Sequence, residues 1–327
     1  MMNKLFFDRL TETLRSPAKT AVICHRNPDP DTLGSAVGLS YILKHFGADV
    51  SVICGDKLPK RLAFITKGKE IFYDGDLSEF ERVIAVDVAS PSQLGELSEY
   101  ADKVDITIDH HEMSTRFSDY YVENCPACAQ IIFKIANHLG LYNIMPKEFF
   151  EAIYAGISGD TGCFKYSNVT SETHVIASKL VNKDIDYAEI NRLIFDSSSF
   201  GEINVQRITY SNMRLWENGR LSTILFTNEM KKENNVSDED IGDIVNHIRK
   251  LEGVLVSVSI KQSSKRENEY SVSSRSNVDI DVSAACAELG GGGHQRAAGC
   301  TVTASSPYEA EKMVVAVFAK RVAEYGG

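Results

Sequence analysis

Residues 24–35 of the chain read CHRNPDPDTLGS, and the fold prediction starts from this stretch. It follows TAVI at residues 20–23, an apolar run of the kind that forms a buried parallel strand. It precedes residues 36–46, whose apolar side chains recur at helical spacing. The stretch is therefore predicted to be a strand-to-helix turn at the carboxyl end of a strand, the edge at which open α/β sheets bind their ligands.

One histidine and two aspartates lie on this predicted turn. His25, Asp29 and Asp31 offer an imidazole and two carboxylates, and two prolines stiffen the loop that carries them. Such a set forms half of a site for a hard divalent metal. An ordinary polar loop, in which Asp31 caps the following helix, is the alternative explanation of the same residues.

The totals of the sequence are those of a globular protein with room for two domains. Its 327 residues are 43% hydrophobic and 24% charged, and the net charge is −10. This charge argues against binding to duplex DNA but leaves open a local basic pocket for a small phosphorylated ligand. Charged residues interrupt residues 1–19 and no apolar run is long enough to span a membrane, so we expect no signal peptide, no membrane contact and a cytoplasmic location.

The cysteines predict neither a zinc site nor a disulfide framework. The chain has seven, an odd number, and Cys125 and Cys128 are the only close pair. No second pair exists to complete a zinc site, so we expect reduced thiols. A thioredoxin-like redox role for this pair is the alternative.

Strand and helix patterns alternate in the first part of the chain. Residues 49–54, 83–88 and 105–108 are apolar strand candidates, and residues 147–158 and 171–180 have helical patterns. This alternation predicts the α/β class with a doubly wound parallel sheet.

The pattern changes near Asp186. We predict a first domain over residues 1–185, a helical connector over 186–216 and a smaller α+β domain over 217–327. In the smaller domain the predicted strands are 221–227, 254–260 and 270–274, the predicted helices are 238–249, 282–289 and 307–323, and residues 262–269 are predicted to be a hairpin tip.

Acidic and imidazole groups stand at four places that we take as strand ends. Besides the first turn, these are Asp87, residues 109–111 (DHH) and Asp160. The carboxyl ends of parallel strands share one edge of a sheet, so we expect these groups to converge. Singly, Asp87 and Asp160 are equally well explained as turn residues, and a lone histidine as a satisfied core residue.

The candidate ligands are imidazole and carboxylate groups without a thiolate, and such a ligand set favours Mn²⁺ or Mg²⁺ over structural zinc. There are more candidate ligands than one octahedral ion needs, which predicts a pair of ions bridged by a carboxylate.

The motifs resemble those of the DHH phosphoesterase superfamily, in the same order. The matching residues are His25, Asp29, Asp31, Gly34, Ser35, Asp87, Asp109, His110, His111 and Asp160. GGGGHQRAAG at residues 290–299 is similar to the glycine-rich signature of the DHHA1 domain. The resemblance covers nearly the whole chain, and the two-domain layout is similar to that of the bacterial nanoRNase (short-oligoribonuclease) and pAp phosphatase family.

The resemblance implies a role for each matching residue. One Mn²⁺ ion would be held by His25, Asp29 and Asp87, and the second by Asp31, Asp87, His110 and Asp160, with Mg²⁺ as an alternative metal. His111 would lie against the scissile phosphate, and Asp109 would orient the histidines. Substrate would be bound by Arg275, Gly291, Gly292, Gly293, His294 and Arg296.

The glycine-rich segment supports that assignment on physical grounds. Glycines let backbone N–H groups approach a phosphate closely, and His294 and Arg296 add side-chain donors. A hinge or a tight packing turn is the alternative. Two departures from the family pattern stand out: Gln93 occupies a position where arginine is frequent, and residues 125–130 replace a Ser/Thr-rich segment.

We therefore expect a Mn²⁺-dependent hydrolase that acts on short single-stranded RNA and on pAp. A phosphodiesterase for pApA or cyclic dinucleotides and a non-catalytic nucleotide-binding regulator are the alternatives. The resemblance also implies a homodimer.

Overall fold

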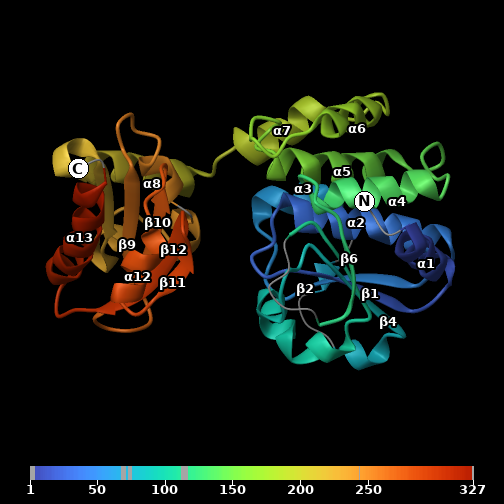
Figure 1. Ribbon diagram of the computed structural model, residues 1–327, viewed down its shortest axis with the longest axis horizontal. Helices are drawn as coiled ribbons and strands as arrows, with labels where there is room; N and C mark the ends of the chain where they lie inside the picture. Colours follow the sequence, from blue (N-terminus) through green and yellow to red (C-terminus); the bar gives the residue numbers. More distant parts are fainter. Residues whose placement is uncertain (1–3, 68–70, 73–75, 112–116, 243, 326–327) are drawn as a thin grey trace. The chain divides into compact units, whose positions relative to one another are not determined.

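The computed structural model describes residues 4–67, 71–72, 76–111, 117–242 and 244–325. The chain forms two compact units, Met1–Ser197 and Ser198–Gly327 (Figure 1). Among the described residues, no helix is both long and apolar enough to cross a membrane.

The first unit is built on a six-stranded sheet in which all strand pairs are parallel, with the order β3-β2-β1-β4-β5-β6. This confirms the predicted α/β class and parallel sheet. The strands are β1 (Thr20–Cys24), β2 (Val50–Cys54), β3 (Ile71–Phe72), β4 (Arg82–Val86), β5 (Ile106–Asp109) and β6 (Asp119–Val122).

The strand order creates a switch point between β1 and β4. From β1 the chain runs outward through β2 and β3 on one side, and from β4 it runs outward through β5 and β6 on the other. Ligands of open α/β sheets bind at the carboxyl ends of the strands at such a point. The predicted turn at His25 follows β1, and Asp87 directly follows β4.

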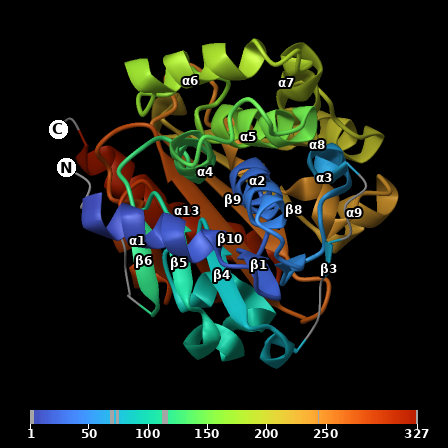
Figure 2. The same ribbon diagram turned by 90° about the vertical axis from the view of Figure 1, so that its right-hand side faces the viewer.

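Alternate residues of each strand pack against opposite layers. Val22 and Cys24 join the core formed with the long helices, and Ala21 and Ile23 join a smaller core on the other face. Figure 2 shows the helices α2, α4 and α5 stacked against one side of the sheet. The helical segments of this unit are α1 (Lys4–Arg15), α2 (Pro30–His45), η1 (Lys60–Leu62), α3 (Ala63–Thr66), η2 (Leu77–Glu79), η3 (Pro91–Lys103), α4 (Cys128–His138), α5 (Lys147–Asp160), α6 (Ser171–Val181) and α7 (Tyr187–Phe195).

Two glycines allow α2 and α5 to cross closely. A Cβ atom on Gly34 would lie 2.3 Å from the carbonyl oxygen of Ala152, and one on Gly156 would lie 2.9 Å from Oδ1 of Asp31. A side chain at either position is therefore incompatible with the observed packing. This close approach brings the carboxyl-terminal end of α5 to the turn after β1.

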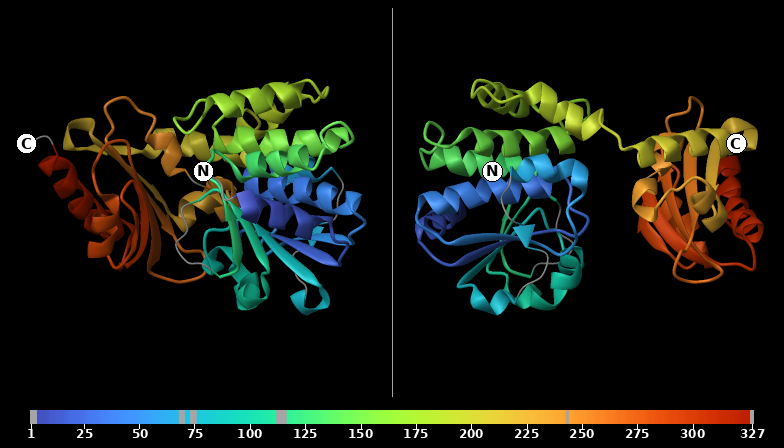
Figure 3. Two further views of the ribbon diagram at one scale, coloured as in Figure 1. Left: turned by 45° about the vertical axis from the view of Figure 1, so that its right-hand side comes forward. Right: turned by 180° about the vertical axis from the view of Figure 1, so that it is seen from behind.

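The second unit contains a mixed six-stranded sheet with the order β11-β12-β10-β9-β8-β7. Only β8 and β9 pair in parallel; the other pairs are antiparallel. Figure 3 shows this smaller sheet with its helices. The elements are α8 (Phe200–Asn212), β7 (Arg214–Trp216), η4 (Glu217–Gly219), β8 (Leu221–Phe226), α9 (Asn228–Glu233), α10 (Asp238–Ile241), α11 (Val245–Ile248), β9 (Val256–Gln262), β10 (Glu269–Ser276), α12 (Val282–Glu288), β11 (Gly292–His294), β12 (Ala297–Thr303) and α13 (Pro307–Glu324).

One detail of the second part of the chain differs from the sequence prediction. The single helix predicted over residues 238–249 is wrong, because Gly242 has φ +47° and ψ −137° and ends α10 before α11 begins. The glycine-rich segment forms part of a β-hairpin, β11 and β12. Of the two helices in residues 186–216, α7 lies in the first unit and α8 in the second.

Candidate active site

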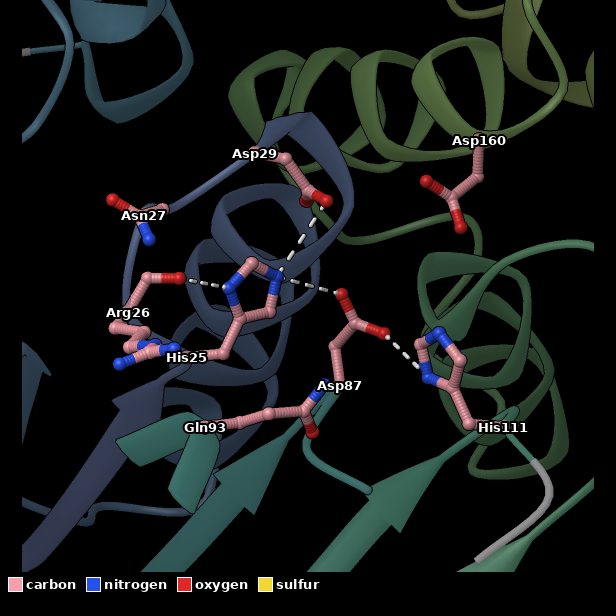
Figure 4. A pocket seen from close by; sticks show the side chains of 8 residues that line it. All are labelled: His25, Arg26, Asn27, Asp29, Asp87, Gln93, His111 and Asp160. Carbon is pink, nitrogen blue, oxygen red and sulfur yellow. Dashed lines mark hydrogen bonds and ion pairs between the residues drawn. The ribbon is translucent and has the colours of Figure 1, made fainter. Parts of the chain in front are cut away.

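The predicted metal and catalytic residues of the first unit converge at the carboxyl edge of its sheet. Five of them, His25, Asp29, Asp87, His111 and Asp160, line a pocket of about 380 Å³ (Figure 4). The residues that line it are His25, Arg26, Asn27, Asp29, Asp87, Gln93, His111 and Asp160. Arg26 and Asn27 are not among the residues predicted from the sequence, in which only their position next to His25 points to the site.

The turn after β1 is fixed by hydrogen bonds to its own backbone. Asp29 caps α2, because its Oδ1 accepts from the backbone N–H groups of Asp31 and Thr32 at 2.9 and 3.0 Å. The alternative in which Asp31 caps this helix is therefore wrong. Nδ1 of His25 lies 2.7 Å from the carbonyl oxygen of Arg26, which directs Nε2 of the ring toward Asp29 at 3.5 Å.

Asp87 stands at the centre of the cluster. Its Oδ2 lies 3.4 Å from Nε2 of His25, and its Oδ1 lies 3.3 Å from Nε2 of His110. Its φ is +60°, an unfavourable conformation for a residue with a side chain, and its N–H donates to the carbonyl of Ile108 at 2.9 Å. Strained backbone of this kind clusters at functional sites.

The second group of predicted ligands is positioned by the start of α4. Both carboxylate oxygens of Asp31 accept backbone N–H groups there, from Cys128 at 2.6 Å and from the next residue at 2.9 Å. The carbonyl oxygen of Cys125 lies 3.0 Å from Nδ1 of His110. Nε2 of that ring thus faces Asp160 at 3.3 Å and Asp31 at 3.7 Å. The atypical segment at residues 125–130 therefore contributes its backbone to the site, a role that its side chains did not reveal.

Asp160 reaches the site from a helix. It is the last residue of α5, so the prediction that it follows a strand is wrong. Its carboxylate arrives through the close crossing of α2 and α5, and sequence periodicity carries no information on that contact.

Asp109 organises the two histidines that follow it. Its side chain is fully buried, and its Oδ1 accepts from the backbone N–H of His110 at 2.7 Å and from Nδ1 of His111 at 2.9 Å. This leaves Nε2 of His111, whose side chain is 44% exposed, free to contact a ligand. The hydrogen bond to Asp109 raises the pKa of His111 above its ordinary value.

The charged groups of the site shift one another's pKa values. Burial opposes the charged form of His25, but its contacts with Asp29 and Asp87 prevail and raise its pKa to about 11. Burial likewise opposes the charge on His110, and contacts with Asp160 and Asp87 raise its pKa to about 12. Burial, and then the neighbouring carboxylates, raise the pKa of Asp31.

The residues fit a divalent metal centre. His25, Asp29 and Asp87 offer ligand atoms within 4.8 Å of one another, and a second group of the same kind is formed by Asp31, His110 and Asp160. Oδ1 of Asp87 and Nε2 of His110 are buried and lie 3.3 Å apart, and within the described ranges neither makes a hydrogen bond of good geometry. Buried polar atoms without a well-formed hydrogen bond are rare, and a metal ion between such atoms would satisfy them. Imidazole and carboxylate donors without thiolate suit Mn²⁺ or Mg²⁺.

The predicted substrate residues lie in the second unit. Arg275 of β10 pairs with Ala297 of β12, which pairs with His294 of β11. Directly paired residues point to the same face of a sheet, so Arg275 and His294 share a face at a spacing of two strands, about 10 Å. Residues of the opposite parity, such as Val272, pack into the core with α12 and α13. Arg296 is exposed in the turn between β11 and β12.

The glycines beside these residues have a packing role. A Cβ atom on Gly291 would lie 2.3 Å from the carbonyl oxygen of Gly299, and one on Gly293 would lie 2.7 Å from another carbonyl oxygen of β12. The N–H of Gly291 donates to the carbonyl of Cys286 at 2.8 Å. Gly292 has open space around it. The alternative of a tight packing turn therefore accounts for two of the three glycines.

Comparison with known families agrees with this geometry. Residues 19–157 match the DHH family, N-terminal domain, and residues 222–324 match the DHHA1 domain. A probable bifunctional oligoribonuclease and PAP phosphatase NrnA of Streptococcus mutans is 30% identical over 293 residues, 86% of this chain and 89% of the relative. The chain belongs to the DHH phosphoesterase family. It is a phosphoester-hydrolysing enzyme.

One further relative and one solved structure are similar to this DHH protein over most of its length. The bifunctional oligoribonuclease and PAP phosphatase NrnA of Thermus thermophilus is 30% identical over 287 residues, 86% of this chain and 83% of the relative. The crystal structure of an exopolyphosphatase-related protein from Bacteroides fragilis has a TM-score of 0.88 at 23% identity and covers 99% of this chain and 97% of that one. That structure shows the fold.

Proposed function

We propose that this DHH protein is a Mn²⁺-dependent hydrolase that degrades short oligoribonucleotides to nucleoside 5′-monophosphates and dephosphorylates pAp to AMP. The observation that carries the proposal is Asp87, whose two oxygens face two separate ligand groups at 3.4 and 3.3 Å. A carboxylate shared in this way is typical of two-metal phosphoesterases.

The residues of the first unit would hold the ions. One ion would be bound by His25, Asp29 and Asp87, and the other by Asp31, Asp87, His110 and Asp160. Bound divalent ions supply charge that stabilises the displacement at phosphorus and lower the pKa of a bound water. The carbonyl groups of Arg26 and Cys125 orient the two histidines, each through its Nδ1.

His111 contacts the phosphate that is hydrolysed. Because Nδ1–H of His111 donates its hydrogen bond to Asp109, Nε2 of His111 is the atom that faces the pocket and donates to a phosphate oxygen or to the leaving group. The buried carboxylate of Asp109 stabilises the charged imidazole and keeps the ring in this orientation. Asp109 is thus a positioning residue.

Capture of the nucleotide is assigned to the second unit. Arg275 and His294 share a face of the sheet, and Arg296 and Gly292 lie beside them in the chain. The division of labour follows the predicted domains, with chemistry in residues 1–185, capture in residues 217–327 and residues 186–216 as the connection.

The named relatives support this choice of substrates. Relatives that cover most of the chain at 30% identity are called bifunctional oligoribonucleases and PAP phosphatases. A nucleotide-binding regulator without catalysis is expected to have lost a ligand, whereas each predicted ligand of this chain stands in the cluster.

The test is a Mn²⁺ activity panel on the purified protein, with pAp, pApA, cyclic di-AMP and single-stranded RNAs of increasing length. We expect release of AMP from pAp and of nucleoside 5′-monophosphates from the shortest RNAs, with activity declining as the RNA lengthens. Turnover of cyclic di-AMP or pApA alone assigns the protein to the dinucleotide phosphodiesterases instead. Absence of turnover in every arm, in Mn²⁺-loaded protein that binds AMP, identifies a regulator.

A further inference from the structure

The active-site pocket contains an arginine that no metal or catalytic assignment uses. Among the described residues that line the pocket, Arg26 is the only lysine or arginine. Asp29, Asp87 and Asp160 line the same pocket. Within the described ranges its guanidinium makes neither an ion pair nor a hydrogen bond, although three carboxylates line the same pocket. Those carboxylates face the histidines instead.

The backbone of Arg26 is held on both sides. Its N–H donates to the carbonyl oxygen of Gln93 at 2.6 Å, and its own carbonyl lies 2.7 Å from Nδ1 of His25. The next N–H, of Asn27, donates to Oδ2 of Asp56 at 2.8 Å. The position from which the side chain starts is therefore fixed, and little backbone freedom is lost when the guanidinium binds a ligand.

Gly95 lies against the aliphatic part of the Arg26 side chain. Gly95 has φ +63° and ψ −125°, a conformation that residues with a side chain avoid. A Cβ atom there would lie 3.0 Å from Cβ and 3.7 Å from Cδ of Arg26. The bend in η3 thus leaves room for the aliphatic part of Arg26 to lie along it.

The neighbouring polar side chain is already engaged. Oε1 of Gln93 accepts from the backbone N–H groups of Ala89 and Ser90 at 2.5 and 3.2 Å, so it caps the start of η3. Figure 4 shows Arg26 and Asn27 on one side of His25, and Asp160 and His111 on the far side of Asp87. A phosphate between these sides would meet His111 from one direction and Arg26 from the other.

We propose that Arg26 is a substrate-binding residue that holds a non-bridging oxygen of the phosphate being hydrolysed. The inference rests on the proposed phosphoesterase function and adds to it the cation that faces the phosphate from the β1 side. Guanidinium groups bind phosphate through two parallel N–H···O bonds, which a single ammonium group cannot reproduce. This role differs from the one proposed for Arg275 and His294. Arg26 would bind the phosphate of any phosphoester that enters the pocket, whereas Arg275 and His294 would bind the nucleotide.

The test compares wild type, Arg26→Gln, Arg26→Lys and the matched control Arg9→Ala, which removes an exposed arginine of the same unit outside the pocket. Substrates are pAp and bis-p-nitrophenyl phosphate, at saturating Mn²⁺ and with bound metal measured for each protein. We expect Arg26→Gln to lower kcat/KM by about tenfold or more for both substrates and to weaken binding of inorganic phosphate, measured by calorimetry, by a similar factor. Arg26→Lys should recover part of the loss, and Arg9→Ala should equal wild type.

Several results contradict the proposal. A change below about threefold in Arg26→Gln means that the guanidinium does not touch the phosphate. A fall in kcat/KM for pAp alone means that Arg26 binds another part of the nucleotide and not the phosphate being hydrolysed. A fall in kcat/KM that parallels a fall in bound metal means that Arg26 stabilises the metal-binding loop. Failure of the proposed function is recognised separately, as wild-type protein that cleaves bis-p-nitrophenyl phosphate but neither pAp nor RNA. Phosphate binding still tests Arg26 in that case.

Discussion

The role of Asp109 as a positioning residue can be tested by Asp109→Asn. The substitution keeps the size of a side chain that is fully buried and allows its amide oxygen to accept the same three N–H groups, from the backbone of His110 and His111 and from Nδ1 of His111. The substitution removes the negative charge of the Asp109 carboxylate. A hydrogen bond to a charged group contributes about 1.5–3 kcal/mol and a neutral one about 0.5–1.5 kcal/mol, so the imidazolium of His111 loses about 1–2 kcal/mol of stabilisation.

That loss converts into a fall in kcat of about five- to thirtyfold. Asp109→Ala should cause a larger loss of kcat and also lower the stability of the first unit by about 1–3 kcal/mol, because it leaves three partly buried donors without their acceptor. The two variants therefore separate the electrostatic effect from the structural one. The matched control is Asp105→Asn, at the other end of β5, whose Oδ2 accepts from the backbone N–H of Val83 at 2.8 Å.

The assay is a double-mutant cycle with His111→Ala, read as kcat on bis-p-nitrophenyl phosphate at saturating Mn²⁺, with thermal unfolding of each protein as a folding control. If Asp109 acts through His111, Asp109→Asn should change kcat by less than about threefold in the His111→Ala background. Full additivity of the two losses, with unchanged Tm, refutes the reasoning.

Three further outcomes follow from the structure. Gly34→Ala should lower the Tm by roughly 5 °C or more and reduce bound metal, because its Cβ would lie 2.3 Å from a carbonyl oxygen of α5; an unchanged Tm contradicts the close crossing. Replacing Cys125 and Cys128 together by serine should leave phosphoesterase activity within a few-fold, since both contribute through backbone atoms; a loss as large as that of a metal ligand assigns their thiols a role. Arg275→Ala and His294→Ala should each raise KM for pAp by about tenfold and leave bis-p-nitrophenyl phosphate hydrolysis nearly unchanged; parallel losses place them in the chemical step.

Much of the site could be predicted because its residues are local in sequence. The first turn supplies His25, Asp29 and Asp31 within seven residues of the chain, and apolar strands precede it and residues 109–111. Parallel strands bring such positions to one edge, so convergence follows from the alternation of strands and helices alone. The choice of Asp87 as the shared ligand also agrees with its central position between His25 and His110.

The remaining features depend on contacts between distant segments. Asp160 reaches the cluster from a helix because Gly34 and Gly156 permit close packing of α2 and α5. A glycine in a helical pattern does not indicate which other helix packs against it. The binding of Asp31 by the start of α4 uses backbone N–H groups, which every residue but proline possesses. The pairing of the glycine-rich segment with β12 could not be predicted from the sequence, because glycine disfavours strands.

The most direct test of the account is the metal content of the protein. Wild-type protein loaded with Mn²⁺ and freed of excess metal should contain about two ions per chain, and Asp87→Asn at most one, because both ligand groups lose a carboxylate that lies within 3.5 Å of their histidines. Asp105→Asn should bind as wild type. One ion per chain at full activity, or two ions retained in an active Asp87→Asn variant, contradicts the assignment of a metal pair shared at Asp87.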